Sequence, residues 1–431
     1  MTDNLLHIFQ CLGKHLEESG FKGVDPHDGL NSPLVKALTL GDRRLGVAAL
    51  QFFKRCPLNL RPLFGIRPGI NPKAHGLLVA TYVQKYRMIG DVADLAQARE
   101  FADWLIENRS PGRSGAAWGY NFDWPNRNAI FPAGTPTIVN TAYIAEALLD
   151  LFEVTGDEKY KATALSSADF LLKDLNRSGT DDEFCFSYTP RDQTQIHNAN
   201  MLGAALLARI YRVLVSLVDS KEPTPPFGHP SKGGDSPPLE GWMEQRDRRG
   251  GSETSDLATR IKNAAQASMR FSINRQQPDG SWLYGTESRN SWIDSYHTGY
   301  NLLAIKRYMQ ALSVTNYELQ LRTGYSFYLD NFFTSDGFVK YYHDRTYPWD
   351  GHAMAHALLT LDELEYLDPE RSRAIREKVI ARIQDTFWDA RRGCFIYLIN
   401  KRYTNRIDYY RWVQCWFFYA LMRHLALGAG D

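Results

Sequence analysis

The stretch GFVKYYHDRTYPWDGHAMAHALLTLDELEYL, residues 337–367, shows the plan on which this chain is built. It opens with a short aromatic segment after a glycine, continues through a polar connector, and ends in an apolar segment that predicts a buried helix. A second segment, at 369–388, is apolar on one face only. Such a pair predicts a helical hairpin with one helix inside a domain and the other outside.

The same plan recurs along the chain. Aromatic segments that follow a glycine or an acidic turn lie near Trp118, Phe184, Trp282, Phe338 and Phe395. Phe338 lies 56 residues after Trp282, and Phe395 lies 57 residues after Phe338. Regular spacing of this size is typical of repeated helical hairpins.

The repeated segments together predict twelve helices. The apolar segments predict inner helices near 75–88, 139–154, 197–218, 297–313, 352–366 and 411–426, and the amphipathic ones predict outer helices near 34–55, 92–108, 157–175, 255–275, 317–333 and 369–388. Six hairpins suffice to close a ring. The predicted fold is therefore an all-α (α/α)6 toroid with short β-like aromatic connectors, in a single domain over residues 1–431. An open right-handed solenoid of hairpins is the nearest alternative.

One segment interrupts the regular spacing. Residues 219–254 are rich in Pro, Gly and Ser, which predicts an inserted loop between two helices of the ring. A mobile lid is an alternative interpretation, because long loops are often functional.

Composition excludes several classes of protein. The 50 Lys and Arg residues nearly balance 49 Asp and Glu residues, so the basic excess typical of nucleic-acid binding is absent. Five scattered cysteines without a CxxC pair argue against a disulfide framework or a cysteine zinc site. The N-terminus lacks the features of a signal peptide, and Arg209 and Arg212 interrupt the apolar stretch 204–218. We expect a cytoplasmic protein without a membrane span.

A toroid brings polar groups together at one end. All inner helices run in the same direction, so their N-termini, with unpaired N–H groups and positive dipole ends, meet at one mouth. The connectors that precede these helices carry acids, Arg, Tyr and His. Gathering Arg345, Arg411 and His352 in a dry interior would be costly without an anionic partner. We therefore expect a ligand carboxylate or phosphate at the mouth.

The candidate site residues all come from these connectors and helix starts. The candidate catalytic residues are Tyr296, His297, His343, Tyr347, Tyr409, Asp294 and Asp350. The candidate substrate-binding residues are Trp124, Asn140, His197, Asn198, Tyr300, Arg345, His352, Arg406, Arg411 and Trp412.

Structural roles are open alternatives for several of them. Asn140, Asn198 and Asp294 also suit helix caps, and His297 also suits a core histidine. Arg406 and Arg411 also suit structural ion pairs, as does Arg345 with Asp344, Asp350 or another acid. His352 and His356 share a helix face, but no third metal ligand accompanies them. We expect neither a metal nor a cofactor.

Two resemblances support the predicted fold. RFSINRQQPDGSW, residues 270–282, resembles the Gln–Trp motif of squalene and hopene cyclases, which are built from α/α toroids, although the acidic DxDD signature of those enzymes is missing. YHTGYNLLAIKRY, residues 296–308, is similar to a segment that opens an inner helix in the C-terminal toroid of D-glucuronyl C5-epimerases. YTNRIDYYRW, residues 403–412, is a looser match to the same family. The chain as a whole resembles a related bacterial family found near exopolysaccharide genes.

The epimerase resemblance implies a proton-transfer reaction on an oligo- or polysaccharide, acidic if it follows that family. Uronate C5-epimerisation needs a base on one side of the sugar, an acid on the other, and cations beside the carboxylate. A polysaccharide lyase would use the same groups. A glycoside hydrolase would instead need two carboxylates, and acids are present in the same connectors. A non-catalytic glycan-binding or scaffold protein of polysaccharide biosynthesis is a further alternative.

Overall fold

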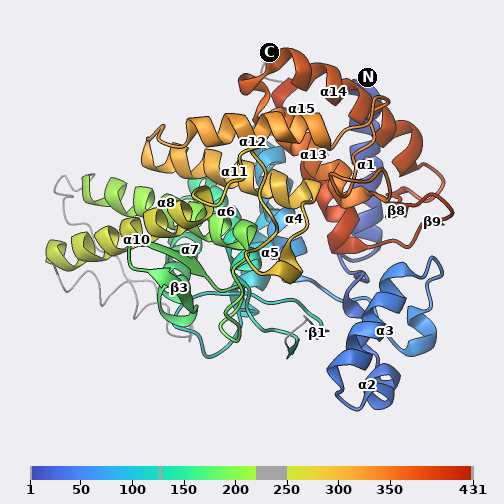
Figure 1. The fold of residues 1–431 in the computed structure, drawn as a ribbon, viewed down its shortest axis with the longest axis horizontal. Coiled ribbons are helices and arrows are strands. Elements are labelled where there is room, and N and C mark those ends of the chain that lie inside the picture. Colours follow the sequence, from blue (N-terminus) through green and yellow to red (C-terminus); the bar gives the residue numbers. More distant parts are fainter. Residues whose placement is uncertain (1, 126–128, 220–249, 429–431) are drawn as a thin grey trace.

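The computed structural model describes residues 2–125, 129–219 and 250–428. Six helices form the inner ring: α4 (Pro72–Ile89), α6 (Ile138–Thr155), α8 (His197–Asp219), α11 (Ser295–Leu312), α13 (Gly351–Glu363) and α15 (Cys415–Gly428). Each packs against the next, and α15 packs against α4, so the ring closes (Figure 1). The predicted toroid is confirmed, and the open solenoid is wrong.

Six further helices form the outer ring. Five of them pair with the inner helix that precedes them in the chain: α5 (Val92–Glu107), α7 (Glu158–Asp169), α10 (Gly250–Ile273), α12 (Glu318–Asn331) and α14 (Pro369–Arg382). The sixth is α1 (Thr2–Glu18), which packs against α15. Three π-helical turns flank these helices: η3 (Phe170–Asp174), η6 (Ile383–Phe387) and η7 (Tyr410–Gln414).

The outer helix predicted at 34–55 is wrong. This segment forms two helices, α2 (Pro33–Thr39) and α3 (Arg43–Arg55). The chain breaks between them because Leu40 and Gly41 adopt positive φ angles of 47° and 75°. Asp42 then caps α3 by accepting a hydrogen bond from the Leu45 amide.

The place of that outer helix is taken by α1. Its Leu5, Ile8, Leu12 and Leu16 recur with helical spacing and are all buried. Phe9 stacks on Phe418 of α15 with ring centroids 4.5 Å apart. The N-terminal and C-terminal helices thus complete the double ring together.

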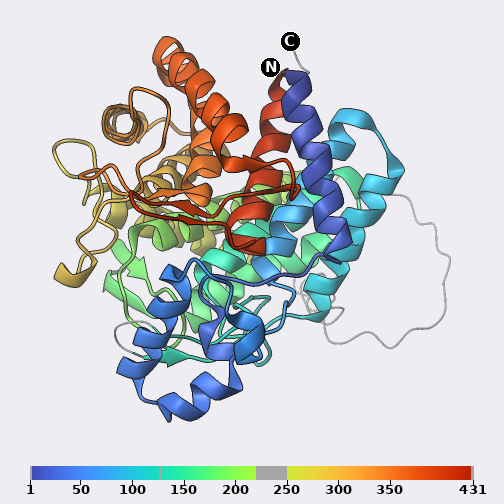
Figure 2. The same cartoon turned by 90° about the vertical axis from the view of Figure 1, so that its right-hand side faces the viewer.

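Residues 25–69 form a separate helical cluster, which we call the cap. It contains α2, α3 and the short turns η1 (Asp28–Asn31) and η2 (Arg61–Phe64). Leu30, Val35, Phe53 and Ile66 make a small core of its own. The cap protrudes from the ring at the lower right of Figure 1 and at the bottom of Figure 2.

In the described part of the chain, the connectors contain only short antiparallel strands, as predicted. They are β1 (Trp124–Pro125) with β2 (Ile130–Phe131), β3 (Arg177–Thr180) with β4 (Glu183–Phe186), β6 (Trp388–Asp389) with β7 (Cys394–Phe395), and β5 (Trp349–Asp350) with β8 (Leu398–Ile399) and β9 (Thr404–Asn405). Two 3-10 turns, η4 (Ser288–Asn290) and η5 (Glu365–Leu367), complete the described elements.

The helices on either side of the segment 219–254, which was predicted as an inserted loop, extend into that segment. Asp219 belongs to α8, and α10 already begins at Gly250. Residues 220–249 lie outside the described part of the chain. Within the described part, α8 is long and apolar enough to cross a membrane, but 67% of the apolar window is buried inside the ring.

Candidate functional site

A pocket of about 430 Å³ opens where the inner helices begin. The first turns of α4, α6, α8, α11 and α13 supply residues to its lining, as do the connectors and the cap. The side chains that line it are mostly aromatic or basic. They include His27, Lys54, Lys73, Tyr120, Trp124, Tyr188, Asn198, Tyr284, Glu287, Arg289, Trp292, Tyr296, His297, Tyr300, Tyr341, His352, Arg411 and Trp412.

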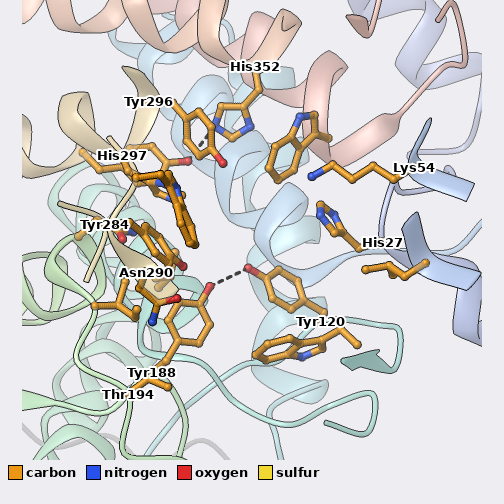
Figure 3. A pocket seen from close by; sticks show the side chains of 18 of the residues that line it. His27, Lys54, Tyr120, Tyr188, Thr194, Tyr284, Asn290, Tyr296, His297 and His352 are labelled. Atoms are coloured by element: carbon orange, nitrogen blue, oxygen red, sulfur yellow. Dashed lines mark hydrogen bonds between the residues drawn. The ribbon is translucent and has the colours of Figure 1, made fainter. Parts of the chain in front are cut away.

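Aromatic rings cover much of the wall. Tyr284 stacks on Trp292 with centroids 4.4 Å apart. The hydroxyl oxygens of Tyr120 and Tyr188 lie 3.3 Å apart, which joins two connectors (Figure 3). Flat rings with polar tips bind molecules that have one apolar face and several hydroxyl groups.

His297 is held in one orientation by the cap of its own helix. Asp294 accepts a hydrogen bond from the His297 amide and therefore caps α11. The same carboxylate lies 2.7 Å from His297 Nδ1 and accepts a hydrogen bond from Trp292 Nε1. Because Asp294 is the acceptor, the proton sits on Nδ1, and Nε2 is left for a ligand.

A second Asp–His pair comes from the cap. Asp25 Oδ1 lies 3.2 Å from His27 Nδ1 and also accepts from the His27 amide. Burial lowers the pKa of His27 to about 4, although the hydrogen bond with Asp25 acts in the opposite direction. His27 is therefore neutral at pH 7. Figure 3 shows His27 and His297 on opposite walls of the pocket.

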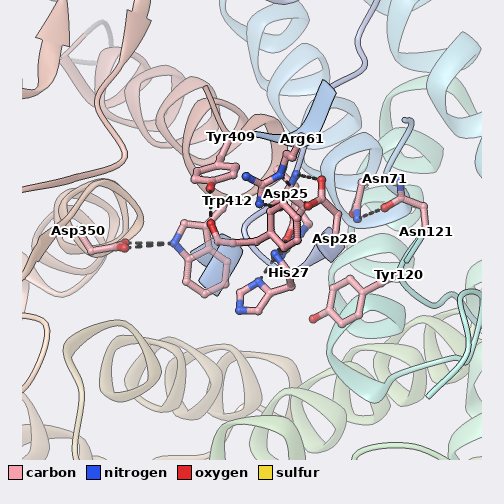
Figure 4. Close-up of polar contacts among 12 residues, drawn as sticks. Asp25, His27, Asp28, Arg61, Asn71, Tyr120, Asn121, Asp350, Tyr409 and Trp412 are labelled. Atoms are coloured by element: carbon pink, nitrogen blue, oxygen red, sulfur yellow. Dashed lines mark hydrogen bonds and ion pairs between the residues drawn. The ribbon is translucent and has the colours of Figure 1, made fainter. Parts of the chain in front are cut away.

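Arg411 connects the cap to the ring through a buried ion pair. Its Nε and Nη2 atoms donate to the two carboxylate oxygens of Asp25 over 2.7 Å and 2.9 Å. Asp28 and Arg61 form another buried pair beside it, at 2.7 Å (Figure 4). Burial raises the pKa of Asp25, but Arg411 and His27 outweigh this and lower it far below its usual range.

Two lysines lie in the pocket beside aromatic rings. Lys73 Nζ is 4.5 Å from the Tyr143 ring centroid, and Lys54 Nζ is 5.7 Å from that of Trp412. Neither has an acidic oxygen at ion-pair distance among the described residues. Burial lowers the pKa of both amines, that of Lys73 strongly.

Lys73 ends in a short chain of polar groups in the pocket. Its amine donates to the Tyr300 hydroxyl over 3.4 Å, and that hydroxyl lies 2.9 Å from His352 Nε2. Burial lowers the pKa of His352 well below its ordinary value, and Lys73 lowers it further. His352 is thus a neutral hydrogen-bonding group.

Acidic side chains are scarce in the pocket. Among the lining residues of the described chain, Glu287 is the single carboxylate, and it pairs with Arg289. Asp350 lies behind the wall, where it caps α13 and accepts from Trp412 Nε1 over 3.3 Å. Burial raises the pKa of Asp350 to about 6.

Eight of the residues predicted from the sequence line the pocket. They are Trp124, Asn198, Tyr296, His297, Tyr300, His352, Arg411 and Trp412. Tyr296 donates or accepts a 2.9 Å hydrogen bond with Tyr341, which holds its hydroxyl at the wall.

Five others lie behind the wall. Besides Asp294 and Asp350, these are Asn140, His197 and Tyr409, all of which are buried. His197 bonds to Ser272 on α10, and the ring of Tyr409 lies under the Arg61 guanidinium. Asn140 does not cap α6, because Thr137 does.

Four predicted residues lie outside the pocket. Arg345 is exposed and makes two 2.9 Å hydrogen bonds with the adjacent Asp344, and Arg406 is exposed and pairs with Asp389. His343 lies 3.4 Å from the Ile293 carbonyl, and Tyr347 packs on Trp349. His197, His343 and Arg345, which were predicted as catalytic or substrate-binding residues, therefore do not line this pocket.

Several pocket residues were not predicted from the sequence. His27 and Lys54 belong to the cap. His27 precedes every predicted helix, and Lys54 lies in the segment 34–55, which was predicted as an outer helix. Lys73 follows the helix signal Asn71–Pro72, but no aromatic connector marks it. The one signal that was available was the position of Lys73 two residues before the inner helix predicted at 75–88.

Outside the pocket, one group of side chains has metal-ligand chemistry. His15, Cys394 and Asp408 bring their ligand atoms within 4.8 Å of one another, and no other such group of three occurs in the described chain. His15 and Asp408 already bond to each other at 2.7 Å.

The chain matches no family model. It also matches no curated protein. Solved structures with a similar fold include a cellobiose 2-epimerase from Bacillus thermoamylovorans, with a TM-score of 0.58 and 12% identity over 84% of this chain and 90% of that one. An unsaturated glucuronyl hydrolase specific for heparin has a TM-score of 0.54 and 12% identity, over 84% of this chain and 88% of that one. An α-mannanase from Bacteroides thetaiotaomicron has a TM-score of 0.54 and 12% identity, over 83% and 86%. At these identities the likeness shows the fold alone, which is that of an (α/α)6 toroid.

Proposed function

We propose that this protein is a carbohydrate epimerase that inverts a sugar carbon by removing a proton on one face and returning a proton on the other. The observation that carries the proposal is the pair of Asp–His dyads, Asp25–His27 and Asp294–His297, on opposite walls of one pocket. Each carboxylate orients its imidazole and stabilises the imidazolium that forms when a proton arrives.

The proton steps follow from this arrangement. Neutral His27 removes the proton from the carbon next to a carbonyl or carboxylate, and the electron pair moves onto that oxygen as an enolate. Protonated His297 then delivers its proton to the opposite face, and the C–H bond forms with inverted configuration. In the reverse direction the two histidines exchange roles.

The charges in the pocket favour an acidic sugar. Arg411 uses two of its nitrogens for Asp25, and its Nη1 remains for a ligand. Lys54 has no acidic oxygen at ion-pair distance in the described chain. Both cations would stabilise the negative charge that develops on a uronate carboxylate. Uronate C5-epimerisation is therefore the specific reaction that we propose.

Two features of the comparisons and the pocket support this class over hydrolysis. The fold is shared with a cellobiose 2-epimerase, so a toroid of this kind accommodates sugar epimerisation. A glycoside hydrolase needs two carboxylates beside the scissile bond. The described lining residues supply one, Glu287.

Incubation with acidic and neutral oligosaccharides in deuterated water tests the proposal. We expect deuterium at C5 of a uronate with no cleavage. A new double bond that absorbs ultraviolet light would assign a lyase, and a new reducing end would assign a hydrolase; either result overturns epimerisation. His343→Gln is the matched control, because this histidine lies outside the pocket.

A further inference from the structure

The cap presents an unusual surface of apolar and basic side chains. Of the thirteen large hydrophobic side chains that are exposed in the described chain, seven lie on the cap: Leu34, Leu38, Leu40, Leu45, Phe52, Leu58 and Leu63. Leu40 is 89% exposed, Leu63 76% and Leu38 72%. Single exposed leucines are ordinary, but a concentration of this kind marks an interaction surface.

These side chains belong to faces that the rest of the protein leaves uncovered. On α3, Gly46, Leu50 and Phe53 are buried, whereas Leu45 and Phe52, seven positions apart, are exposed on the other face. On α2, Leu34 and Leu38 are exposed one turn apart. The helices α2 and α3 contact each other, and α2 also contacts η2, so these side chains belong to one small body.

The charge of the same segment is one-sided. The cap contains seven Lys or Arg residues and three acids, Asp25, Asp28 and Asp42, in a chain whose net charge is +1. Lys54 lines the pocket and Arg61 pairs with Asp28, but Arg44, Arg55 and Arg67 are exposed. Asp42 is occupied as the cap of α3.

We propose that the cap docks on an anionic lipid surface. Leucine side chains inserted among acyl chains, together with Arg and Lys at the headgroups, are the combination by which short amphipathic helices bind membranes without crossing them. In a protein predicted to be cytoplasmic, the lipids of the facing leaflet carry negative charge. Charge complementarity therefore favours lipid over a second copy of this chain, whose cap has the same positive sign.

Docking would also bring the pocket to the membrane surface. The helix that presents Leu45 and Phe52 outward supplies Leu50, Gln51 and Lys54 to the pocket on its other side. A glycan attached to a lipid anchor would then meet the pocket without leaving the membrane. The proposal goes beyond the epimerase assignment, and its test needs no catalytic activity.

Co-sedimentation of the full chain with lipid vesicles tests the docking. We expect binding to vesicles of phosphatidylcholine mixed with phosphatidylglycerol, little binding to pure phosphatidylcholine, and weaker binding at high salt. Leu38→Ser with Leu63→Ser, and Arg44→Glu with Arg55→Glu, should each weaken binding at least ~10-fold. None of these four residues lines the pocket.

Two matched double variants are the controls. Leu319 and Leu427 are exposed elsewhere, as is Lys14, so Leu319→Ser with Leu427→Ser, and Lys14→Glu with Arg322→Glu, should bind as the wild type does. Absence of binding to any vesicle, or equal loss in controls and cap variants, would overturn the proposal. So would a dimer in solution that the cap variants break apart while vesicle binding is absent, because the surface would then belong to a second copy.

Discussion

At the scale of single residues, the pocket depends on charges that are buried in pairs. Asp25 and Arg411 are both almost fully buried, and each supplies the counter-charge of the other. Such a pair adds little to stability compared with an apolar pair of the same size, but the loss of one partner leaves a buried charge alone. The pair therefore suits the proposed function, in which it orients His27 and Arg411 toward a ligand.

Replacement of Asp25 separates the contribution of the ion pair to stability from its role in orienting His27 and Arg411. We expect Asp25→Asn to lower the free energy of unfolding by about 3–5 kcal/mol, because Arg411 keeps its charge. Asp25→Asn with Arg411→Met should recover much of that stability, since both charges are gone, yet remain inactive. Urea unfolding and the epimerase assay measure the two outcomes. A double variant as unstable as the single one would show that the ion pair is not the source of the loss.

The same pair predicts a pH dependence. The pKa of Asp25 is lower in the folded protein than in the unfolded chain, so its contribution is complete above the ordinary carboxyl range, near pH 4, and is lost as the pH falls further. Unfolding free energies of wild type and Asp25→Asn, measured from neutral pH downward, should therefore converge in acid. A gap that stays constant would contradict this linkage.

At the scale of elements, the ring depends on close approach of neighbouring inner helices. Gly299 on α11 faces α13 so closely that an added Cβ would lie 2.6 Å from His356 Nδ1 and 2.7 Å from Thr360 Oγ1. Neither of these two groups is at the end of a flexible side chain. The close approach of α11, which carries His297, to α13, which carries His352, therefore requires a residue without a side chain at position 299.

Gly299→Ala should therefore destabilise the protein by about 1–3 kcal/mol, because the two helices must separate. Gly46→Ala is the matched control, since its Cβ would meet nothing closer than 3.7 Å in a helix of the cap. Alanine favours a helix, so the control should be neutral or stabilising by about 0.5–1 kcal/mol. Equal losses in the two variants would contradict the close-packing account.

The elements also show what the sequence could and could not predict. Eleven of the twelve ring helices overlap their predicted segments, because burial on all sides or on one side leaves a periodic pattern. The exception is the outer helix predicted at 34–55. This segment has an amphipathic pattern, but the helix is interrupted at Gly41 and Asp42. The pattern in α1 was visible at the same time, but periodicity does not say which partner a helix covers.

Site residues were predictable only where the repeat placed them. His297 and His352 lie at the starts of inner helices and reach the pocket. Arg345 and Arg406 instead form ion pairs with acidic side chains of the connectors. His27 reaches the pocket through the fold of the cap, which has no repeat. The direction of a side chain in a connector and the packing of the cap on the ring both depend on tertiary contacts. They could therefore not be predicted from the periodicity of a single sequence.

At the scale of the whole molecule, the two ends of the chain close the toroid together. Because α1 covers the outer side of α15, and α15 contacts α4, the ring needs its first helix as well as its last. Leu12 is completely buried in α1, and Leu319 is 69% exposed on α12.

Leu12→Ala should lower the free energy of unfolding by about 2–5 kcal/mol, whereas Leu319→Ala should change it by less than about 0.5 kcal/mol. Urea denaturation of the two variants measures the difference. A Leu12→Ala protein as stable as the control would mean that α1 is not part of the ring in solution.

The most direct test of the two-histidine account is exchange of the C5 proton, followed separately for each epimer of a uronate in deuterated water. In wild type both epimers should take up deuterium and interconvert. His27→Gln and His297→Gln should each abolish interconversion, yet each should still exchange the one epimer whose proton faces the remaining histidine, and the two variants should exchange opposite epimers. His343→Gln should behave as wild type. Interconversion that survives either substitution, or exchange of the same epimer in both variants, would contradict proton transfer from two walls of the pocket.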